Sequence, residues 1–395
     1  MFAGIENDNL HPMSQANPFS PEHELFRKTV RDFAEKELLP HKEEWEKNKD
    51  FPKSVFKKAG DLGILGVCFP ESVGGSGGDY WFKVVFCEEI VRCKMAGVAM
   101  DLLVQDDIST PIIHTLGTDE QKELFLKPAI RGDKIGALGI TEPGCGSDVA
   151  SIKTTAKADG DDYVINGAKM FITNGGKADF ITLSVRTGGP GFKGISLVTF
   201  PTDVKGFSVG KTLEKMGNYS SNTTLLFFEN CRIPKRFLLG QENLGFTYIM
   251  KNFQGERLVA ALTCGASAEL ALQDAISYTK EREAFGQKVI NFQVWQHKFA
   301  ELATQLEAAK RLNYHAVTLY DAGVECTKEI SMAKLFAGDL AQRVAYDCLQ
   351  AFGGAGYMEE YDIARFARDI RLMTIGGGTS EVMKEIIAKR LNLSS

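Results

Sequence analysis

The hydrophobic period of the sequence changes twice along the chain, and this constrains the fold more than any other feature. In residues 21–134, apolar residues recur at the spacing of one helix face, as Leu25, Phe26, Val30 and Phe33 do. The middle of the chain has the composition of short strands, and the last third returns to helical spacing. Helices and strands are therefore segregated, which predicts an α+β fold.

The order of these periods predicts three domains after a polar N-terminal tail. Residues 1–20 are polar and are predicted to be disordered. An N-terminal α-helical domain is expected over 21–134, and a central β domain of barrel or sandwich type over 135–243. Long helical segments over 244–395 are expected to pack as an antiparallel bundle.

Individual elements follow from the same patterns. Helical spacing predicts helices over 53–62, 81–95, 120–129, 246–283, 292–321 and 328–350. Aromatic and β-branched composition predicts strands over 162–173, 181–185, 195–200 and 223–228. Asn166-Gly167 predicts a hairpin turn within the first of these strands. In the last helix a stripe with a repeat of four residues predicts a packed face, and it consists of Met332, Phe336, Leu340, Val344 and Cys348.

The composition argues against several classes of protein. The net charge of -5 gives no support for nucleic-acid binding, which usually needs a basic face. No segment reaches the roughly 18 apolar residues of a membrane span. The eight cysteines form no C-x-x-C pair and have no histidine at zinc-ligand spacing, so we expect reduced thiols and no metal site. The first residues lack the apolar segment of a secretory signal, which predicts bacterial cytoplasm or mitochondrial matrix.

The common nucleotide and hydrolase motifs are absent. The segment 206–212 resembles a P-loop, but it has three residues between its glycines where four are needed, and we expect a strand, a turn and a second strand there. Gly144-Cys145-Gly146 does not continue into G-x-G-x-x-G, which argues against a Rossmann site. H-E-x-x-H and G-x-S-x-G do not occur, which argues against metallohydrolases and α/β-hydrolases.

Five glycine-punctuated polar segments remain, at the junctions between the predicted elements. They offer unhindered backbone N–H groups, hydroxyls and an arginine, which suit a large phosphate-bearing cofactor. The segments are ITEPGCGSD (140–148), KMFITNGG (169–176), EREAFGQ (281–287), QAFGGAGY (350–357) and IGGGTSE (375–381). Each segment alone is typical of ordinary loops.

Together, in this order and spacing, the five segments resemble the acyl-CoA dehydrogenase family over residues 21–393. The resemblance implies the same three domains, with four helices in the C-terminal bundle. It also implies FAD as the cofactor, oxidation of an acyl-CoA thioester to a trans-2-enoyl-CoA, and an electron-transfer flavoprotein as the acceptor. Cys145 stands where the family usually has a small residue such as alanine, and a thiol is only slightly larger.

The resemblance further implies which residues bind the flavin. Residues of the first segment should lie beside the flavin ring and pyrophosphate, namely Ile140, Thr141, Gly146 and Ser147. Phe171, Ile172 and Thr173 should pack on the other face of the ring. The phosphates and adenine should meet Arg282, Gln293, Gln350, Gly353 and Gly354 of a neighbouring subunit, in a homotetramer built as a dimer of dimers. Thr379, Ser380 and Glu381 are expected among the flavin contacts.

Removal of a proton from the substrate Cα requires a carboxylate base, and burial raises the pKa of such a group. Many members of the family carry this base just before the last G-T-S segment, where this chain has Gly377. The long-chain and isovaleryl branches carry it on a bundle helix, in a segment similar to Gln254-Gly255-Glu256-Arg257-Leu258. The resemblance therefore assigns the base to Glu256, with Glu381 as its nearest rival.

The substrate contacts implied by the resemblance lie around this base. Ser147, Gly377 and Gly378 should border the thioester, and the N–H group of Gly377 could polarise its carbonyl. Gln254 is expected nearby, and Arg257 either binds polar parts of the CoA or anchors its own helix turn. Two alternatives stay open: an oxidase that passes electrons to O₂, and a binding protein that lost catalysis with Gly377. The acyl chain length is not determined.

Overall fold

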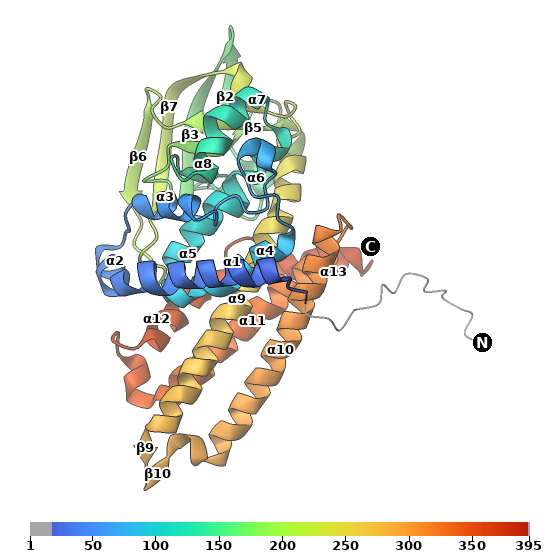
Figure 1. Ribbon diagram of the computed structural model, residues 1–395. Coiled ribbons are helices and arrows are strands. Elements are labelled where there is room, and N and C mark those ends of the chain that lie inside the picture. Colours follow the sequence, from blue (N-terminus) through green and yellow to red (C-terminus); the bar gives the residue numbers. More distant parts are fainter. Residues whose placement is uncertain (1–17, 394–395) are drawn as a thin grey trace, which may run out of the picture.

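The computed structural model describes residues 18–393, so most of the tail predicted to be disordered lies outside the described residues. The fold is mixed α+β, as predicted. Figure 1 shows a sheet domain at one end, N-terminal helices across the middle, and long bundle helices at the other end. Helix α9 (Gly245–Glu281) runs from the sheet domain to the far end of the bundle (Figure 1).

The N-terminal region consists of short helices. Helix α1 begins after Ser20, whose side chain accepts a hydrogen bond from the His23 backbone, and Pro21 occupies its first turn. Helix α1 spans Pro21–Asp32. The α-helices that follow it in this region are α2 (Lys42–Asn48), α3 (Ser54–Asp61), α4 (Tyr80–Ile90), α5 (Ala96–Leu103), α6 (Pro111–Leu116), α7 (Asp119–Gln121) and α8 (Lys127–Ile130). The helix expected over 81–95 was predicted too long, because Lys94 adopts a positive φ of 56° and separates α4 from α5.

The central region forms one eight-stranded sheet. Its strands are β1 (Gly136–Gly139), β2 (Thr155–Asp159), β3 (Asp162–Thr173), β4 (Phe180–Arg186), β5 (Ile195–Pro201), β6 (Phe207–Thr212), β7 (Thr223–Pro234) and β8 (Leu238–Leu239). The strand order is β6-β7-β3-β2-β4-β5-β8, and β1 pairs in parallel with β4. All four predicted strands are present.

Two turn predictions in this domain were wrong. Strand β3 continues through Asn166-Gly167, and the hairpin turn lies instead at Gly160, which has a φ of 58°. Gly167 occupies a bulge against β7, where a Cβ atom would lie 2.5 Å from Thr154 Oγ1, so a close approach explains this glycine. The segment 206–212 contains the single strand β6 rather than two strands joined by a turn.

The bundle consists of α9 (Gly245–Glu281), α10 (Gln293–Asp321), α11 (Thr327–Phe352) and α13 (Ser380–Arg390), with the short helix α12 (Asp362–Asp369) beside them. The three long helices agree with the prediction to within two residues at each end. The four-residue stripe of α11 is buried at Leu340, Val344 and Cys348, but Phe336 is exposed. Four residues advance about 400°, so such a stripe drifts about 40° per step around the helix.

The structure has two hydrophobic cores, and their boundaries do not coincide with those of the three domains. One core joins the first N-terminal helices to the bundle, through residues such as Phe33, Leu102, Leu258 and Val344. The other core joins the sheet to α6 and α8. The eight cysteines are free thiols, as expected. The N-terminal helices therefore pack against both other domains and hold them at a fixed seam.

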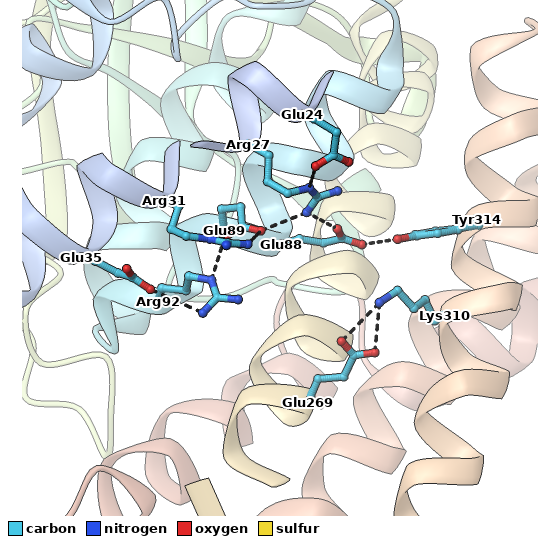
Figure 2. A network of polar contacts seen from close by, with 10 residues as sticks. All are labelled: Glu24, Arg27, Arg31, Glu35, Glu88, Glu89, Arg92, Glu269, Lys310 and Tyr314. Carbon is cyan, nitrogen blue, oxygen red and sulfur yellow. Dashed lines mark hydrogen bonds and ion pairs between the residues drawn. The ribbon is translucent and has the colours of Figure 1, made fainter. Parts of the chain in front are cut away.

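A network of ion pairs joins α1 to α4, and one hydrogen bond extends it to the bundle (Figure 2). Glu89 of α4 accepts hydrogen bonds from Arg27, Arg31 and Arg92 at 2.6–3.0 Å, and its side chain is 3% exposed. Burial by itself would raise the pKa of Glu89, but the hydrogen bonds from Arg31 and Arg27 and the charge of Arg92 lower it to about 2. Tyr314 of α10 donates a hydrogen bond to the neighbouring Glu88.

We predict that Glu89→Gln lowers the free energy of unfolding by about 1.5–3 kcal/mol at pH 7, because it removes the charge that accepts hydrogen bonds from three partly exposed arginines. The carboxylate of Glu89 has a lowered pKa, so its contribution is complete above pH 4.5 and is lost as the pH falls toward about 2. The difference between wild type and variant should therefore narrow over this range, measured by urea unfolding.

The matched control is Glu24→Gln. Glu24 contacts the same Arg27 at 3.4 Å but is 51% exposed, so this change should cost about 0–1 kcal/mol. Equal losses in the two variants would contradict the assigned role of Glu89.

Candidate active site

The family resemblance gives two alternative positions for a base, Glu256 and Gly377, and these two residues lie side by side. Glu256 projects from α9 toward the glycine segment that precedes α13. A Cβ atom built on Gly377 would lie 3.4 Å from Glu256 Oε1 and 4.0 Å from its carboxyl carbon. Gly377 and Gly378 have φ values of 63° and 94°, a conformation that glycine adopts without strain. The carboxyl group therefore packs against a backbone conformation that only glycine adopts easily.

The surroundings of Glu256 favour the neutral form of its carboxyl group. The Oε2 atom is buried and has no hydrogen-bond partner among the described residues. Burial raises the pKa of Glu256 to about 7, while the positive charges of Arg257 and Lys334 partly oppose this rise. A carboxyl group with this pKa can gain or lose a proton near neutral pH, as a general base requires.

Two buried cations flank the glycine segment. Lys334 of α11 is 2% exposed and donates hydrogen bonds to the carbonyls of Gly376 and Gly378, the first at 3.0 Å. Arg257 is 4% exposed, its Nε atom has no hydrogen-bond partner among the described residues, and burial lowers its pKa. Sequence reasoning missed Lys334, although a lysine within the small and apolar run Ser331–Gly338 is a signal of a buried charge.

Gln254 lies two residues before Glu256 on α9 and is partly buried. Its amide nitrogen donates to the Met250 carbonyl at 3.2 Å, while its buried Oε1 atom has no partner among residues 18–393. The side chain therefore keeps an acceptor for another group.

The loop between β1 and β2 carries the first glycine-rich segment. Glu142 and Cys145 exchange two backbone hydrogen bonds, of 2.9 and 3.1 Å, which close a tight turn. Ile140 is buried in the core of the sheet domain, whereas Gly146 and Ser147 are exposed. The space beside Gly144 is open, since no atom lies within 4 Å of a Cβ atom built on this residue. Backbone N–H groups here are accessible to a ligand.

A buried ion pair that sequence reasoning missed holds this loop. Glu142 accepts hydrogen bonds from Lys169 Nζ at 2.9 Å and from the backbone of Lys153 and Thr154 at 2.6 and 2.9 Å. Lys169 is fully buried in β3, and burial lowers its pKa to about 8 despite the charge of Glu142. The sequence contained a signal of this burial, because Lys169 is an even number of residues from Tyr163 and Ile165 and so falls on the same, inward face of the strand.

The end of β3 lies against the same loop, since the Met170 backbone donates to the Thr141 carbonyl at 2.8 Å. Phe171 is 60% exposed and has a positive φ of 60°, which is rare for an aromatic residue. Thr173 is half-buried, whereas Ile172 is buried in the sheet core, so a ligand could meet its backbone rather than its side chain. The structure thus brings the first two glycine segments together.

The residues expected at the cofactor phosphates lie elsewhere. Arg282 ends α9 and Gln293 begins α10, while Gln350, Gly353 and Gly354 lie at the end of α11, and all five are exposed. Arg282 follows Glu256 by a helical segment about 39 Å long. This distance is far beyond the reach of a side chain. Within one chain, therefore, the residues expected at the cofactor phosphates do not meet Glu256.

Comparison with known proteins identifies the family. The N-terminal, middle and C-terminal domains of acyl-CoA dehydrogenases match residues 20–133, 137–231 and 243–392. The mitochondrial long-chain specific acyl-CoA dehydrogenase of Mus musculus is 40% identical over 94% of this chain and 87% of its own. This chain belongs to the acyl-CoA dehydrogenase family. It is therefore an oxidoreductase.

Solved structures agree with this assignment. A probable acyl-CoA dehydrogenase from Mycobacterium abscessus has a TM-score of 0.92 and 42% identity, covering 94% of this chain and 99% of its own. A glutaryl-CoA dehydrogenase from Mycobacterium smegmatis, solved in complex with FADH2, has a TM-score of 0.90 and 30% identity, covering 95% and 96%. The three-domain fold is that of the acyl-CoA dehydrogenases.

In this acyl-CoA dehydrogenase the N-terminus of α13 completes the glycine segment. Thr379 caps the helix by accepting from the Val382 backbone at 3.3 Å, and Ser380 donates to Asp339 at 2.9 Å. Glu381 is exposed, and hydrogen bonds from its own backbone and from Thr379 lower its pKa. An exposed carboxylate of lowered pKa is a poorer base than Glu256.

Within residues 18–393, no group of three or more potential ligands could hold a metal ion. No helix in the described part of the chain is both long and apolar enough to cross a membrane.

We predict that Lys334→Met raises the pKa of Glu256 above about 7, because the positive charge of Lys334 lowers it in the wild type. The pKa can be followed by the infrared band of the buried carboxyl group, which Glu256→Gln would remove and so assign. Lys328→Met, a change of a more exposed lysine on the same helix, should leave the band unchanged. An unaltered titration in Lys334→Met would contradict the proposed coupling.

Proposed function

We propose that this chain is an FAD-dependent enzyme that oxidises the Cα–Cβ bond of an acyl-CoA to give a trans-2-enoyl-CoA. The observation that carries the proposal is the carboxyl group of Glu256, which lies beside Gly377 with its Oε2 atom buried and without a partner among the described residues. Membership of the acyl-CoA dehydrogenase family supports the reaction class.

Glu256 acts as the base in this proposal. Its deprotonated carboxylate removes the proton from the substrate Cα, and the burial that raises its pKa also makes it a stronger proton acceptor. The fixed charges of Arg257 and Lys334 keep the anion accessible near neutral pH. The absence of a side chain at Gly377 leaves the position beside Glu256 open to the substrate, since a Cβ atom there would have only Glu256 atoms within 4 Å.

The residues of this chain fit a flavin. Exposed backbone at Gly146 and Ser147, the partly buried Thr141 and the exposed ring of Phe171 surround the open glycine loop, with Ile140, Ile172 and Thr173 behind them. Thr379, Ser380 and Glu381 would contribute from the N-terminus of α13, where free N–H groups attract polar ligands. When bound, FAD would accept the hydride that leaves the substrate Cβ.

The substrate thioester would lie between Glu256 and the glycine segment. The N–H group of Gly377 can donate to the thioester carbonyl and so acidify the Cα–H bond. Gly378 and Ser147 would border the thioester, and the free acceptor of Gln254 and the unpartnered Nε of Arg257 offer polar contacts. The unpaired polar atoms of this site would then have partners.

A second subunit would complete the cofactor site. Arg282, Gln293, Gln350, Gly353 and Gly354 are exposed and remote from Glu256, as expected if they bind the phosphates and adenine of a neighbour's FAD. Phe285, at the tip of the hairpin between Glu283 and Lys288, is 97% exposed, which also suits a subunit contact. We therefore propose a homotetramer, a dimer of dimers.

The proposed acceptor is an electron-transfer flavoprotein, and the proposed compartment is bacterial cytoplasm or mitochondrial matrix. An oxidase would instead form peroxide in air, and a binding protein would keep FAD without bleaching. Anaerobic addition of acyl-CoAs of 4–16 carbons to the yellow protein, followed by oxygen, separates the three functions.

We predict that Glu256→Gln slows flavin reduction by about 10²–10⁴-fold, because glutamine cannot accept the proton, while acyl-CoA binding is largely retained. In the wild type the rate should fall as the pH drops below about 7, where the carboxyl group becomes protonated. Stopped-flow bleaching of the flavin measures both effects. Glu381→Gln, at the rival base, should slow the reduction far less than Glu256→Gln does, and Glu385→Gln, at an exposed glutamate of α13, should keep the wild-type rate. Wild-type bleaching by Glu256→Gln would exclude Glu256 as the base.

A relocated base should restore part of the activity. In Glu256→Gly/Gly377→Glu the Cβ atom of the new side chain lies 3.4 Å from the former position of Glu256 Oε1, but a residue at a φ of 63° is strained by about 1–2 kcal/mol. Recovery should be incomplete, since a displacement of about 1 Å can cost roughly 100-fold. No gain over Glu256→Gly alone would argue against a shared substrate position.

We predict that Arg282→Ala weakens FAD retention by about 1.5–3 kcal/mol through loss of a charge-assisted phosphate contact. The bound FAD after dialysis and the oligomeric state should be measured together. Arg311→Ala removes an exposed arginine of α10 that pairs with Glu307, and it should retain FAD. A monomer with full FAD occupancy would contradict the shared site.

A further inference from the structure

A polar cavity lies between helices α1 and α4 on one side and the bundle helices α9 and α10 on the other. Its volume is about 770 Å³, within the range of roughly 300–1,000 Å³ that is typical of small-molecule sites. Figure 2 shows the arginine network on one side of this space and Lys310 with Glu269 on the other. The charged residues that line the cavity are Arg27, Arg31, Arg92, Lys310, Glu88, Glu89 and Glu269.

The lining of the cavity carries an excess of positive charge. Four of its side chains are cations and three are carboxylates. Glu24 and Glu35 also contact two of the arginines, each at 3.4 Å, but neither lines the cavity and both are exposed, so water and salt screen their charges. The charge inside the cavity therefore favours an anion.

The cations keep hydrogen-bond donors for such an anion. Arg31 donates to Glu89 through Nε and Nη2, and Arg92 donates to it through Nε, whereas Arg31 Nη1 and Arg92 Nη2 have no partner among residues 18–393. Lys310 Nζ lies 3.3 Å from each oxygen of Glu269, which is longer than a good hydrogen bond. Two guanidinium groups and an ammonium group are a donor set that suits the oxygens of a phosphate.

A buried amide adds a requirement for a donor on the ligand. Asn313 of α10 lines the cavity and is 3% exposed. Its Nδ2 atom donates to the Ala261 carbonyl at 3.0 Å, which fixes the orientation of the amide because a carbonyl oxygen can only accept. The Oδ1 atom is buried and has no partner among the described residues, and such an acceptor is costly to leave without a donor. A hydroxyl group on the ligand would supply this donor.

We propose that this cavity binds a small phosphate compound that carries a hydroxyl group, either hydrogen phosphate itself or a phosphate monoester. Lys310, Arg31 and Arg92 bind the phosphate oxygens, and Asn313 accepts a hydrogen bond from the hydroxyl group. No lining residue belongs to the proposed flavin or thioester contacts, so this site goes beyond the proposed function and does not depend on it. A ligand bound here would contact both the N-terminal helices and the bundle and so stabilise the folded protein.

The test is calorimetric titration of the protein as purified, at constant ionic strength, with inorganic phosphate, glycerol 3-phosphate and sulfate as probes. Two or three charge-assisted hydrogen bonds should give phosphate a Kd on the order of 1 mM or below. Sulfate has no hydrogen to donate to Asn313 and should bind about tenfold more weakly. Tighter binding of glycerol 3-phosphate than of inorganic phosphate would assign the site to a monoester, and the reverse order would assign it to the free ion.

Three variants locate the binding. Lys310→Gln removes a charged donor from a side chain that is 34% exposed, so it should weaken phosphate binding about tenfold or more. The matched control is Lys298→Gln, because Lys298 is on the same helix, is 35% exposed and pairs with Asp347, but lies outside the cavity, so the Kd should stay that of wild type. Asn313→Leu keeps the approximate size of the side chain and should abolish the preference for phosphate over sulfate.

Three results would overturn the inference. They are the absence of saturable binding of both phosphate probes, equal affinities of the wild type for phosphate and sulfate, and unchanged phosphate binding in Lys310→Gln, which would place the anion elsewhere. If Asn313→Leu does not fold, the comparison with sulfate and the two lysine variants still decide.

Discussion

The burial of the Glu256 carboxyl group against the glycine segment is the constraint on which the site depends. Water is excluded from one carboxyl oxygen, which raises the pKa to about 7 and makes the group a useful proton acceptor. Three parts of the chain produce that burial. Helix α9 carries the carboxyl group, and residues 376–378 have no side chains that would displace it. Lys334 of α11 donates hydrogen bonds to two carbonyls of the glycine segment. Loss of any of these would hydrate or displace the proposed base.

The same seam explains why the domains are not independent. The first core combines N-terminal helices with the bundle, and the second combines α6 and α8 with the sheet. The arginine network around Glu89 and the Glu142–Lys169 pair then fix α4 and the β1–β2 loop relative to their neighbours. The flavin site that we propose between these parts would be preorganised on its inner side, and its outer side would depend on residues near Arg282 of another subunit.

Sequence patterns predicted the elements well where one physical signal dominated. The long helices at 245–281, 293–321 and 327–352 follow from sustained helical spacing, and the strands from β-branched composition. Errors arose where tertiary context overrode local preference. Asn166-Gly167 is a strong turn signal, yet close packing of Thr154 makes Gly167 a bulge, and a positive φ at Lys94 divides a helix that periodicity had continued. The buried Lys169 and Lys334 were missed because isolated lysines normally face solvent.

The sequence alone determined the domain order, the family resemblance and the pairing of Glu256 with a glycine at 377, because these are carried by residue identity and spacing. Only the tertiary structure decided that the two positions lie side by side and that one carboxyl oxygen of Glu256 is buried without a partner among the described residues. Desolvation and distance depend on all elements packed around a group. A local pattern cannot specify them, since the atoms that exclude water from Glu256 come from segments more than 70 residues apart.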